Sequence, residues 1–164
     1  MTPAPLRLDL PSPEATDAFA RALAPHLRAG DALLLEGPVG AGKTAFVRAL
    51  IGALRARAGL APEDVPSPTF TLVQTYDTGA FETWHADLYR LADPAEVAEL
   101  GLADAFADAL CLVEWPDRLG RAAPAGAARL TFSAPGPEGV RRLAIEASGD
   151  LDRRLAAAMP SQAA

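Results

Sequence analysis

The chain has 164 residues, 50% of them hydrophobic, and a formal net charge of −6 at pH 7. This length suits one domain with a buried core, and the acidic balance argues against a surface that coats nucleic acid. The single cysteine, Cys111, excludes an internal disulfide, and no apolar stretch reaches the roughly 20 residues that span a bilayer. We therefore expect a cytoplasmic protein without a signal peptide, with a single domain over residues 1–159 and a flexible tail over 160–164.

The first predicted elements are a strand and a helix. Residues 6–10 alternate between apolar and polar side chains, which is typical of a half-buried strand. Ser12, Pro13 and Glu14 then combine an N-cap, a first-turn proline and an acidic first turn. The helix that they begin carries an apolar stripe and is expected to close near Gly30.

A glycine-rich segment follows a short apolar strand over residues 33–35. Residues 37–44 read GPVGAGKT and fit the phosphate-binding loop pattern G-x-x-x-x-G-K-S/T. Backbone N–H groups of such a loop converge on an anion, the Lys43 ammonium can reach the β- and γ-phosphates, and the Thr44 hydroxyl can ligate Mg²⁺. A helix predicted over 45–58 adds its positive dipole end. The predicted ATP-binding residues are Gly37, Val39, Gly40, Ala41, Gly42, Lys43, Thr44 and Ala45.

The composition indicates which nucleotide this loop would hold. Lys43 is the only lysine in a chain that otherwise uses arginine, which favours a site that needs a compact ammonium group. The chain contains no asparagine and no second lysine, so it lacks the Asn/Thr-Lys-x-Asp loop with which GTPases read guanine. We therefore expect ATP.

The rest of the chain alternates strands and helices. The predicted elements are strands over 70–76, 81–88 and 109–113, a helix starting at Asp93, a hairpin over 130–133 and 140–145, and a helix over 151–159. The continuous apolar run over 109–113 is of the kind found in buried parallel strands. With the phosphate-binding loop, this order predicts an α/β fold: a P-loop NTPase-like three-layer sandwich whose mixed, largely parallel central sheet is flanked by helices.

Two acidic residues end predicted strands, where ligands of open α/β sheets bind. Glu114 directly follows the buried strand, as the acid of a Walker B motif does. We therefore expect its carboxylate to lie beside Thr44 and to serve as a magnesium ligand. Asp87 ends the strand before it and could orient water or an acceptor. The alternative for each is a structural role, as a helix cap or as the partner of a surface arginine.

The loop of Ser67, Pro68 and Thr69 is a third candidate. Two prolines, at positions 66 and 68, constrain a turn between helix and strand, a place where P-loop proteins often sense the γ-phosphate. A plain connector is the alternative.

Other conspicuous side chains favour structural readings. His85 has no second His or Cys at metal-ligand spacing, so a zinc site is not expected. Trp84 and Trp115 flank the two acids and are expected to pack in the core, with stacking on a base or a partner as the alternative. For Arg90 we favour pairing with a carboxylate over contact with a phosphate.

These segments, taken together, resemble the TsaE (YjeE) family of bacterial P-loop ATPases. The matching stretches are EGPVGAGKT, SPTFTLVQTY, HADLYRL, GLADAF and CLVEWPDRLG, in the family's order and spacing from about Leu33 to Gly120. The resemblance implies a role in making N6-threonylcarbamoyladenosine at position 37 of tRNAs that decode ANN codons. It also implies that the protein docks on a heterodimer of the proteins TsaD and TsaB, and that ATP binding and hydrolysis reset this complex. The protein would then contact tRNA only indirectly, through the complex.

The resemblance also implies roles for individual residues. Lys43 and Thr44 would hold phosphate and Mg²⁺, with Glu114 as the other metal-side carboxylate. Asp87, with Lys43, would be catalytic, as a base or by orienting water. The loop over 67–69 matches a switch-like segment of the family. Candidate contacts to the adenine or to a partner are Thr16, Trp115 and Gly139.

Two other classes of function remain open from the residues. A small-molecule P-loop kinase shares the loop, Mg²⁺ and a strand-end acid, but usually adds an arginine-rich lid, and only the short stretch 118–121 resembles one. A nucleotide-sensing module without turnover would not need both Asp87 and Glu114.

Overall fold

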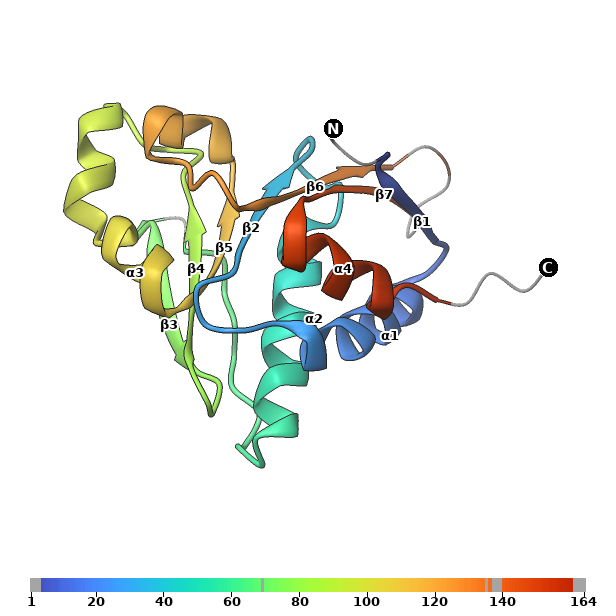
Figure 1. Cartoon of the computed structure of the whole chain (residues 1–164). Coiled ribbons are helices and arrows are strands. Elements are labelled where there is room, and N and C mark those ends of the chain that lie inside the picture. The colour runs from blue at the N-terminus through green and yellow to red at the C-terminus, as the bar shows by residue number, and fades with distance from the viewer. Residues whose placement is uncertain (1–3, 69, 135, 137–139, 161–164) are drawn as a thin grey trace.

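A computed structural model of the chain describes residues 4–68, 70–134, 136 and 140–160. Seven strands form one sheet in the order β1-β7-β6-β2-β5-β4-β3 (Figure 1). The strands are β1 (Leu6–Leu10), β2 (Ala32–Glu36), β3 (Val73–Asp77), β4 (Glu82–Asp87), β5 (Leu110–Glu114), β6 (Ala128–Ser133) and β7 (Arg141–Glu146). The four central strands, β6, β2, β5 and β4, run parallel. β3 pairs antiparallel with β4 at one edge, and on the other side β7 pairs antiparallel with β6 and β1 pairs antiparallel with β7.

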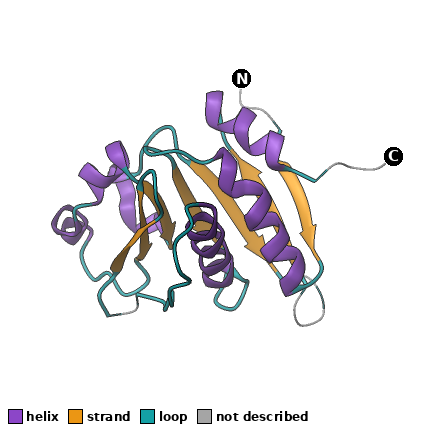
Figure 2. Cartoon of the chain, turned by 90° about the horizontal axis from the view of Figure 1, so that it is seen from below, coloured by secondary structure: helices purple, strands orange, loops and turns teal. Residues whose placement is uncertain are grey.

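Helical segments cover both faces of the sheet (Figure 2). The α-helices are α1 (Pro13–Leu23), α2 (Lys43–Arg57), α3 (Leu102–Asp108) and α4 (Gly149–Ala158). The 3₁₀ segments are η1 (Ala24–His26), η2 (Pro94–Leu100) and η3 (Pro116–Ala122). Helices α1, α2 and α4 pack on one face, and α3, η2 and η3 pack on the other. The structure thus confirms the predicted three-layer α/β sandwich.

The strand periodicity divides the core between the two faces. Along β5, Leu110 and Leu112 join the cluster under α1 and α2, whereas Cys111 and Val113 join the cluster under α3. All four side chains are fully buried, as the continuous apolar run predicted. Glu114 continues the alternation and therefore points to the α2 face, where the glycine-rich loop lies.

Three predicted elements differ from the structure. The first helix ends at Leu23 instead of near Gly30, because Pro25 lacks the N–H that would continue the α-helix. The predicted strand over 70–76 begins only at Val73, and Phe70 is 88% exposed in the turn before it. The helix expected from Asp93 is a 3₁₀ segment, which Gly101, with a φ of +80°, separates from α3.

The remaining elements occur within a few residues of their predicted ends. Ser12 caps α1 by accepting a hydrogen bond from the Ala15 N–H at 3.1 Å, as its sequence context predicted. Residues 161–164 of the expected tail lie outside the described residues. No helix in the described part of the chain has the length and apolarity to cross a membrane.

Candidate functional site

A cavity of about 480 Å³ opens where the central parallel strands end. It lies over the start of α2 and the carboxyl ends of β4 and β5, the edge at which α/β sheets bind ligands. Ten of the predicted site residues line it: Val39, Gly40, Gly42, Lys43, Thr44, Ala45, Ser67, Asp87, Glu114 and Trp115. Its size is in the range of small-molecule sites.

The glycine-rich loop takes a shape that only glycine permits at two positions. Gly37 has a φ of +139°, and a Cβ there would lie 2.5 Å from the carbonyl oxygen of Phe132. Gly42 has a φ of +106°, and its Cβ would lie 3.0 Å from Nε of Arg141. A side chain at Gly37 would push the loop away from the backbone of β6, and the positive φ at Gly42 would strain any other residue where the loop enters α2.

Lys43 is the first residue of α2 and points along the loop. Its ammonium group donates a hydrogen bond to the carbonyl oxygen of Gly37 and lies 3.7 Å from the ring centroid of Trp115. Burial lowers the pKa of Lys43, while the nearby carboxylates of Glu114 and Asp87 act in the opposite direction. The result is a desolvated cation at a helix N-terminus, which is a favourable place for an anion.

Thr44 and Glu114 meet across the cavity floor. The Thr44 hydroxyl donates to the Glu114 carboxylate, with distances of 3.0 Å to Oε1 and 3.1 Å to Oε2. Glu114 is only 2% exposed, because it is held between Leu35 of β2 and Asp87 of β4. A hydroxyl and a carboxylate are oxygen ligands of the kind that Mg²⁺ prefers, and Mg²⁺ usually takes one or two carboxylates together with substrate phosphates. The residues present therefore fit a magnesium ion.

His85 contributes a contact that the sequence did not reveal. Its Nε2 lies 2.7 Å from Oε2 of Glu114, and the ring is fully buried. His85 and Glu114 are diagonal neighbours on adjacent strands, since His85 pairs with Leu112 in the register. Sequence spacing alone does not show this pairing, and no single motif joins the two residues.

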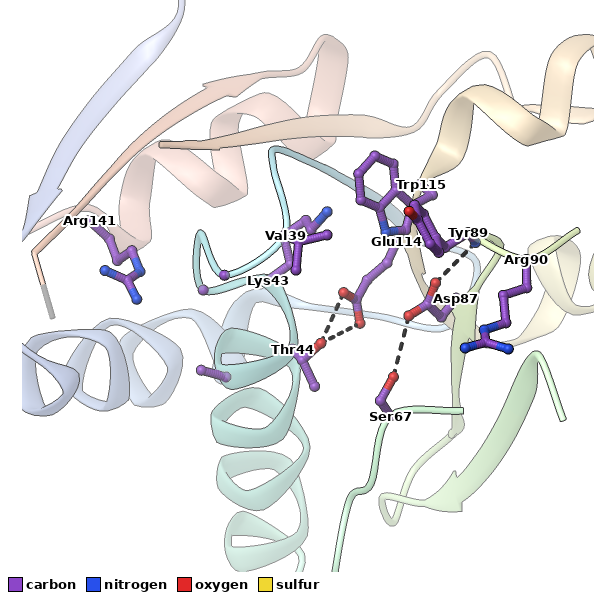
Figure 3. Close-up of a pocket in the computed structure, with 13 residues that line it drawn as sticks. Val39, Lys43, Thr44, Ser67, Asp87, Tyr89, Arg90, Glu114, Trp115 and Arg141 are labelled. Atoms are coloured by element: carbon purple, nitrogen blue, oxygen red, sulfur yellow. Dashed lines mark hydrogen bonds between the residues drawn. The ribbon is translucent and has the colours of Figure 1, made fainter. Parts of the chain in front are cut away.

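Asp87 is held at the rim of the cavity. Its Oδ1 accepts a hydrogen bond from the backbone N–H of Tyr89 at 3.1 Å, and its Oδ2 accepts one from the Ser67 hydroxyl at 3.3 Å (Figure 3). Its own N–H donates to the carbonyl oxygen of Leu72 at 2.9 Å. These contacts join the loop after α2 to the tip of β4.

Trp115 directly follows Glu114 in a left-handed conformation, with a φ of +57°. This backbone turn places the indole ring over Lys43 and 4.9 Å from the ring of Tyr89. Non-glycine residues with positive φ are uncommon and tend to cluster at functional sites. The ring therefore lines the cavity, in addition to packing against the α3-side core.

Some predicted site residues lie elsewhere. Ala41 and Pro68 are buried and do not line the cavity. Gly37 does not line it either, but its carbonyl oxygen accepts the hydrogen bond from Lys43. Thr16 is buried in α1 and does not line the cavity. Thr69 and Gly139 lie outside the described residues.

Two arginines also line the cavity, and Figure 3 shows Arg141 beyond Lys43 on the side away from Arg90. Arg141 begins β7, and no motif in the sequence marked it. Arg90 has no carboxylate partner among the residues described, which corrects the expectation that it forms an ion pair. Its guanidinium instead lies 5.5 Å from the ring centroid of Phe70.

Comparisons with known proteins show which proteins this chain is similar to. The family model described as "Threonylcarbamoyl adenosine biosynthesis protein TsaE" matches residues 10–143. A protein of Rickettsia bellii named tRNA threonylcarbamoyladenosine biosynthesis protein TsaE is 43% identical over 108 residues, which cover 66% of this chain and 72% of that protein. The Bacillus subtilis protein of the same name is 41% identical over 105 residues, which cover 63% of this chain and 62% of that protein.

The fold is also similar to a solved structure. The crystal structure titled Bacillus subtilus YdiB superimposes with a TM-score of 0.76 and 29% sequence identity, over 95% of this chain and 96% of that one. The family match spans the glycine-rich loop, both strand-end acids and the start of β7. The chain therefore belongs to the TsaE family.

Proposed function

We propose that this protein is an ATPase with Mg²⁺ as its cofactor and takes part in the biosynthesis of threonylcarbamoyladenosine in tRNA. Membership of the TsaE family supports the role in tRNA modification. The cavity supports the chemistry. In the proposed role the protein docks on the TsaD–TsaB heterodimer and resets it through ATP binding and hydrolysis, without itself handling tRNA.

The observation that carries this proposal is the contact between Thr44 and Glu114. A hydroxyl at the first turn of α2 and a carboxylate at the tip of β5 lie 3.0 Å apart, next to the Lys43 ammonium group. Bound Mg²⁺ would neutralise charge on the β- and γ-phosphates. Thr44 and Glu114 would hold it, and the loop N–H groups and Lys43 would bind phosphate oxygens.

Asp87 is the residue that we assign to the attacking water. Each of its oxygens accepts one hydrogen bond and keeps a further lone pair for a water molecule. It borders the cavity one strand away from Glu114, so the two acids serve different parts of the same substrate. Asp87 would orient the water or take its proton, and Glu114 would stay on the metal side.

Exposed apolar side chains at the cavity mouth support the docking part of the proposal. Val39 is 78% exposed and Tyr89 is 52% exposed, and both line the cavity. Phe70, beside Arg90, is 88% exposed. Large apolar residues gathered at an opening are typical of a surface that a partner covers. A partner here would also close the site over the γ-phosphate.

The test is to measure phosphate release from ATP by the protein alone and with the purified TsaD–TsaB pair, while following complex formation with ATP, ADP or no nucleotide. We expect slow release alone, faster release with the pair, and assembly that depends on the nucleotide; by linkage, the nucleotide then binds more tightly in the complex. Assembly indifferent to nucleotide, with an unchanged rate, would overturn the docking role. Phosphate found on an added small metabolite would favour a kinase.

A further inference from the structure

His85 and Glu114 form a buried pair beneath the cavity, and the pair has a consequence for the metal side of the site. We propose that His85 is a positioning residue, which holds one carboxylate oxygen of Glu114 so that the other faces Thr44 and the cation. This inference rests on the proposed Mg²⁺-dependent nucleotide site. It goes beyond that site by assigning a role to a residue that touches neither nucleotide nor metal.

The geometry separates the two oxygens of Glu114. The Thr44 hydroxyl lies at nearly equal distances, 3.0 and 3.1 Å, from Oε1 and Oε2, so Thr44 alone does not decide how the carboxylate is turned. Nε2 of His85 contacts only Oε2, at 2.7 Å. The contact with His85 therefore fixes the rotation of the carboxylate group and leaves Oε1 available beside the Thr44 oxygen.

Burial makes this contact strong and specific. The side chain of His85 is 0% exposed and that of Glu114 is 3% exposed. A buried carboxylate is costly unless it accepts hydrogen bonds, and His85 donates one of them. Removing the imidazole donor would leave Oε2 with only the longer contact to Thr44, which both oxygens share, and would free the group to turn.

Hydrogen-bond accounting identifies the nitrogen that carries the proton. A carboxylate only accepts hydrogen bonds, so Nε2 of His85 is the donor in this contact. Nδ1 is buried and has no partner within the described part of the chain. An N–H there would be an orphaned donor, which is rarer in folded proteins than an unpaired acceptor. The hydrogen bonds of the described residues therefore favour the tautomer with the proton on Nε2.

Three variants of the full chain test the proposal. His85→Leu removes the hydrogen-bond donor and fills its place with an apolar side chain of similar size. His85→Gln keeps an N–H near the position of Nε2, and His85→Asn has an amide too short to reach Glu114. The readout is the affinity for ADP measured by calorimetry with Mg²⁺ and with a chelator, together with the thermal unfolding midpoint of each variant.

We expect His85→Leu and His85→Asn to lose about 10- to 100-fold in affinity with Mg²⁺, as is usual when a residue that orients a metal ligand is removed. Their affinity without Mg²⁺ should stay unchanged, and His85→Gln should keep most of the Mg²⁺ response. In a Glu114→Gln background, His85→Leu should cause no further loss, because it acts through that carboxylate. Nitrogen NMR of the wild-type imidazole should show the proton on Nε2.

The contrary outcomes are distinct. The inference would be overturned if His85→Leu lost as much ADP affinity without Mg²⁺ as with it, or if His85→Gln and His85→Asn had the same affinities. Either result would mean that His85 has a structural role only. A proton on Nδ1 alone would do the same, and this readout does not depend on whether His85→Leu folds. Wild-type protein that binds no nucleotide would overturn the proposed function as well.

Discussion

The two sides of the cavity are held in different ways. On the side of α2 and β5, which we call the buried side, Lys43 is 4% exposed and Glu114 is 2% exposed. Short hydrogen bonds join their side chains to the Gly37 carbonyl and to the fully buried His85 of β4. On the open side, formed by the loop between α2 and β3 and by the segment after β4, Ser67 and Arg90 are exposed, and the contact between Ser67 and Asp87 is a longer one of 3.3 Å.

This difference separates binding from turnover. Groups that hold phosphate and Mg²⁺ need a preorganised site, because ordering them at the moment of binding would cost affinity. Groups that activate water act only in the transition state, and a partner that covers the cavity mouth can order them later. We therefore expect variants on the buried side to change affinity and variants on the open side to change rate.

The largest effect is expected from Asp87→Ala on the open side. If Asp87 orients or deprotonates water, the rate of phosphate release with the TsaD–TsaB pair should fall about 100- to 10,000-fold, with ADP affinity nearly unchanged. Asp9→Ala removes an exposed carboxylate that pairs with Arg142 and serves as the matched control. A parallel loss of affinity in Asp87→Ala would contradict the division between the two sides.

The reactivity of the Cys111 thiol reports whether β5, on the buried side, opens in the folded protein. Burial in the centre of β5 raises the pKa of this thiol to about 12 from 9.0, and nearby Asp108 adds to the shift. At pH 8 the thiolate fraction is then about 1000-fold below that of an ordinary cysteine, so a thiol reagent should label the protein only after unfolding. Because the folded state resists ionisation, stability should fall as the pH rises above about 9. Rapid labelling of the folded protein would show that β5 opens.

Lys43→Ala should weaken nucleotide binding by about 10- to 150-fold, because a charge-assisted contact of about 1.5–3 kcal/mol is lost. Lys43→Arg should also bind poorly, since a planar fork does not fit between the Gly37 carbonyl and the Trp115 ring. Calorimetry with ADP checks both. Wild-type affinity in Lys43→Arg would show that charge alone, without the shape of the ammonium group, is sufficient.

The smallest effect is expected from Ser67→Ala. One hydrogen bond to Asp87 would be lost, with a net contribution of about 0.5–1.5 kcal/mol, or roughly 2- to 13-fold in rate. Affinity for ADP should not change. A loss of rate as large as that of Asp87→Ala would mean that Ser67 itself contacts the reacting groups.

Much of the fold follows from local sequence. The alternation in residues 6–10, the capping by Ser12 and the apolar run ending at Glu114 each predicted an element that the structure confirms. The errors occur where a local rule competes with another one. Pro25 cuts the first helix short, and the apolar residue Phe70, which suggested a strand, lies in an exposed turn.

The site was predictable only in part, for a physical reason. Lys43 and Thr44 share one motif, and the strand-end position of Glu114 predicted its meeting with Thr44 across 70 residues of chain. The contacts of His85 and Arg141 depend on strand order and register. His85 reaches Glu114 only because β4 pairs with β5, and Arg141 reaches the loop only because β7 lies beyond β6. Local patterns in a single sequence do not reveal the order of the strands in the sheet.

A crystal structure with Mg²⁺ and a non-hydrolysable ATP analogue would test the central claim most directly. We expect phosphates over the glycine-rich loop and the cation beside Oγ1 of Thr44 and Oε1 of Glu114, with oxygen distances of about 2.0–2.1 Å for direct ligands. We also expect the Lys43 ammonium group to leave the Gly37 carbonyl for a phosphate oxygen. A nucleotide bound elsewhere, or a cation away from both Thr44 and Glu114, would contradict the proposed site.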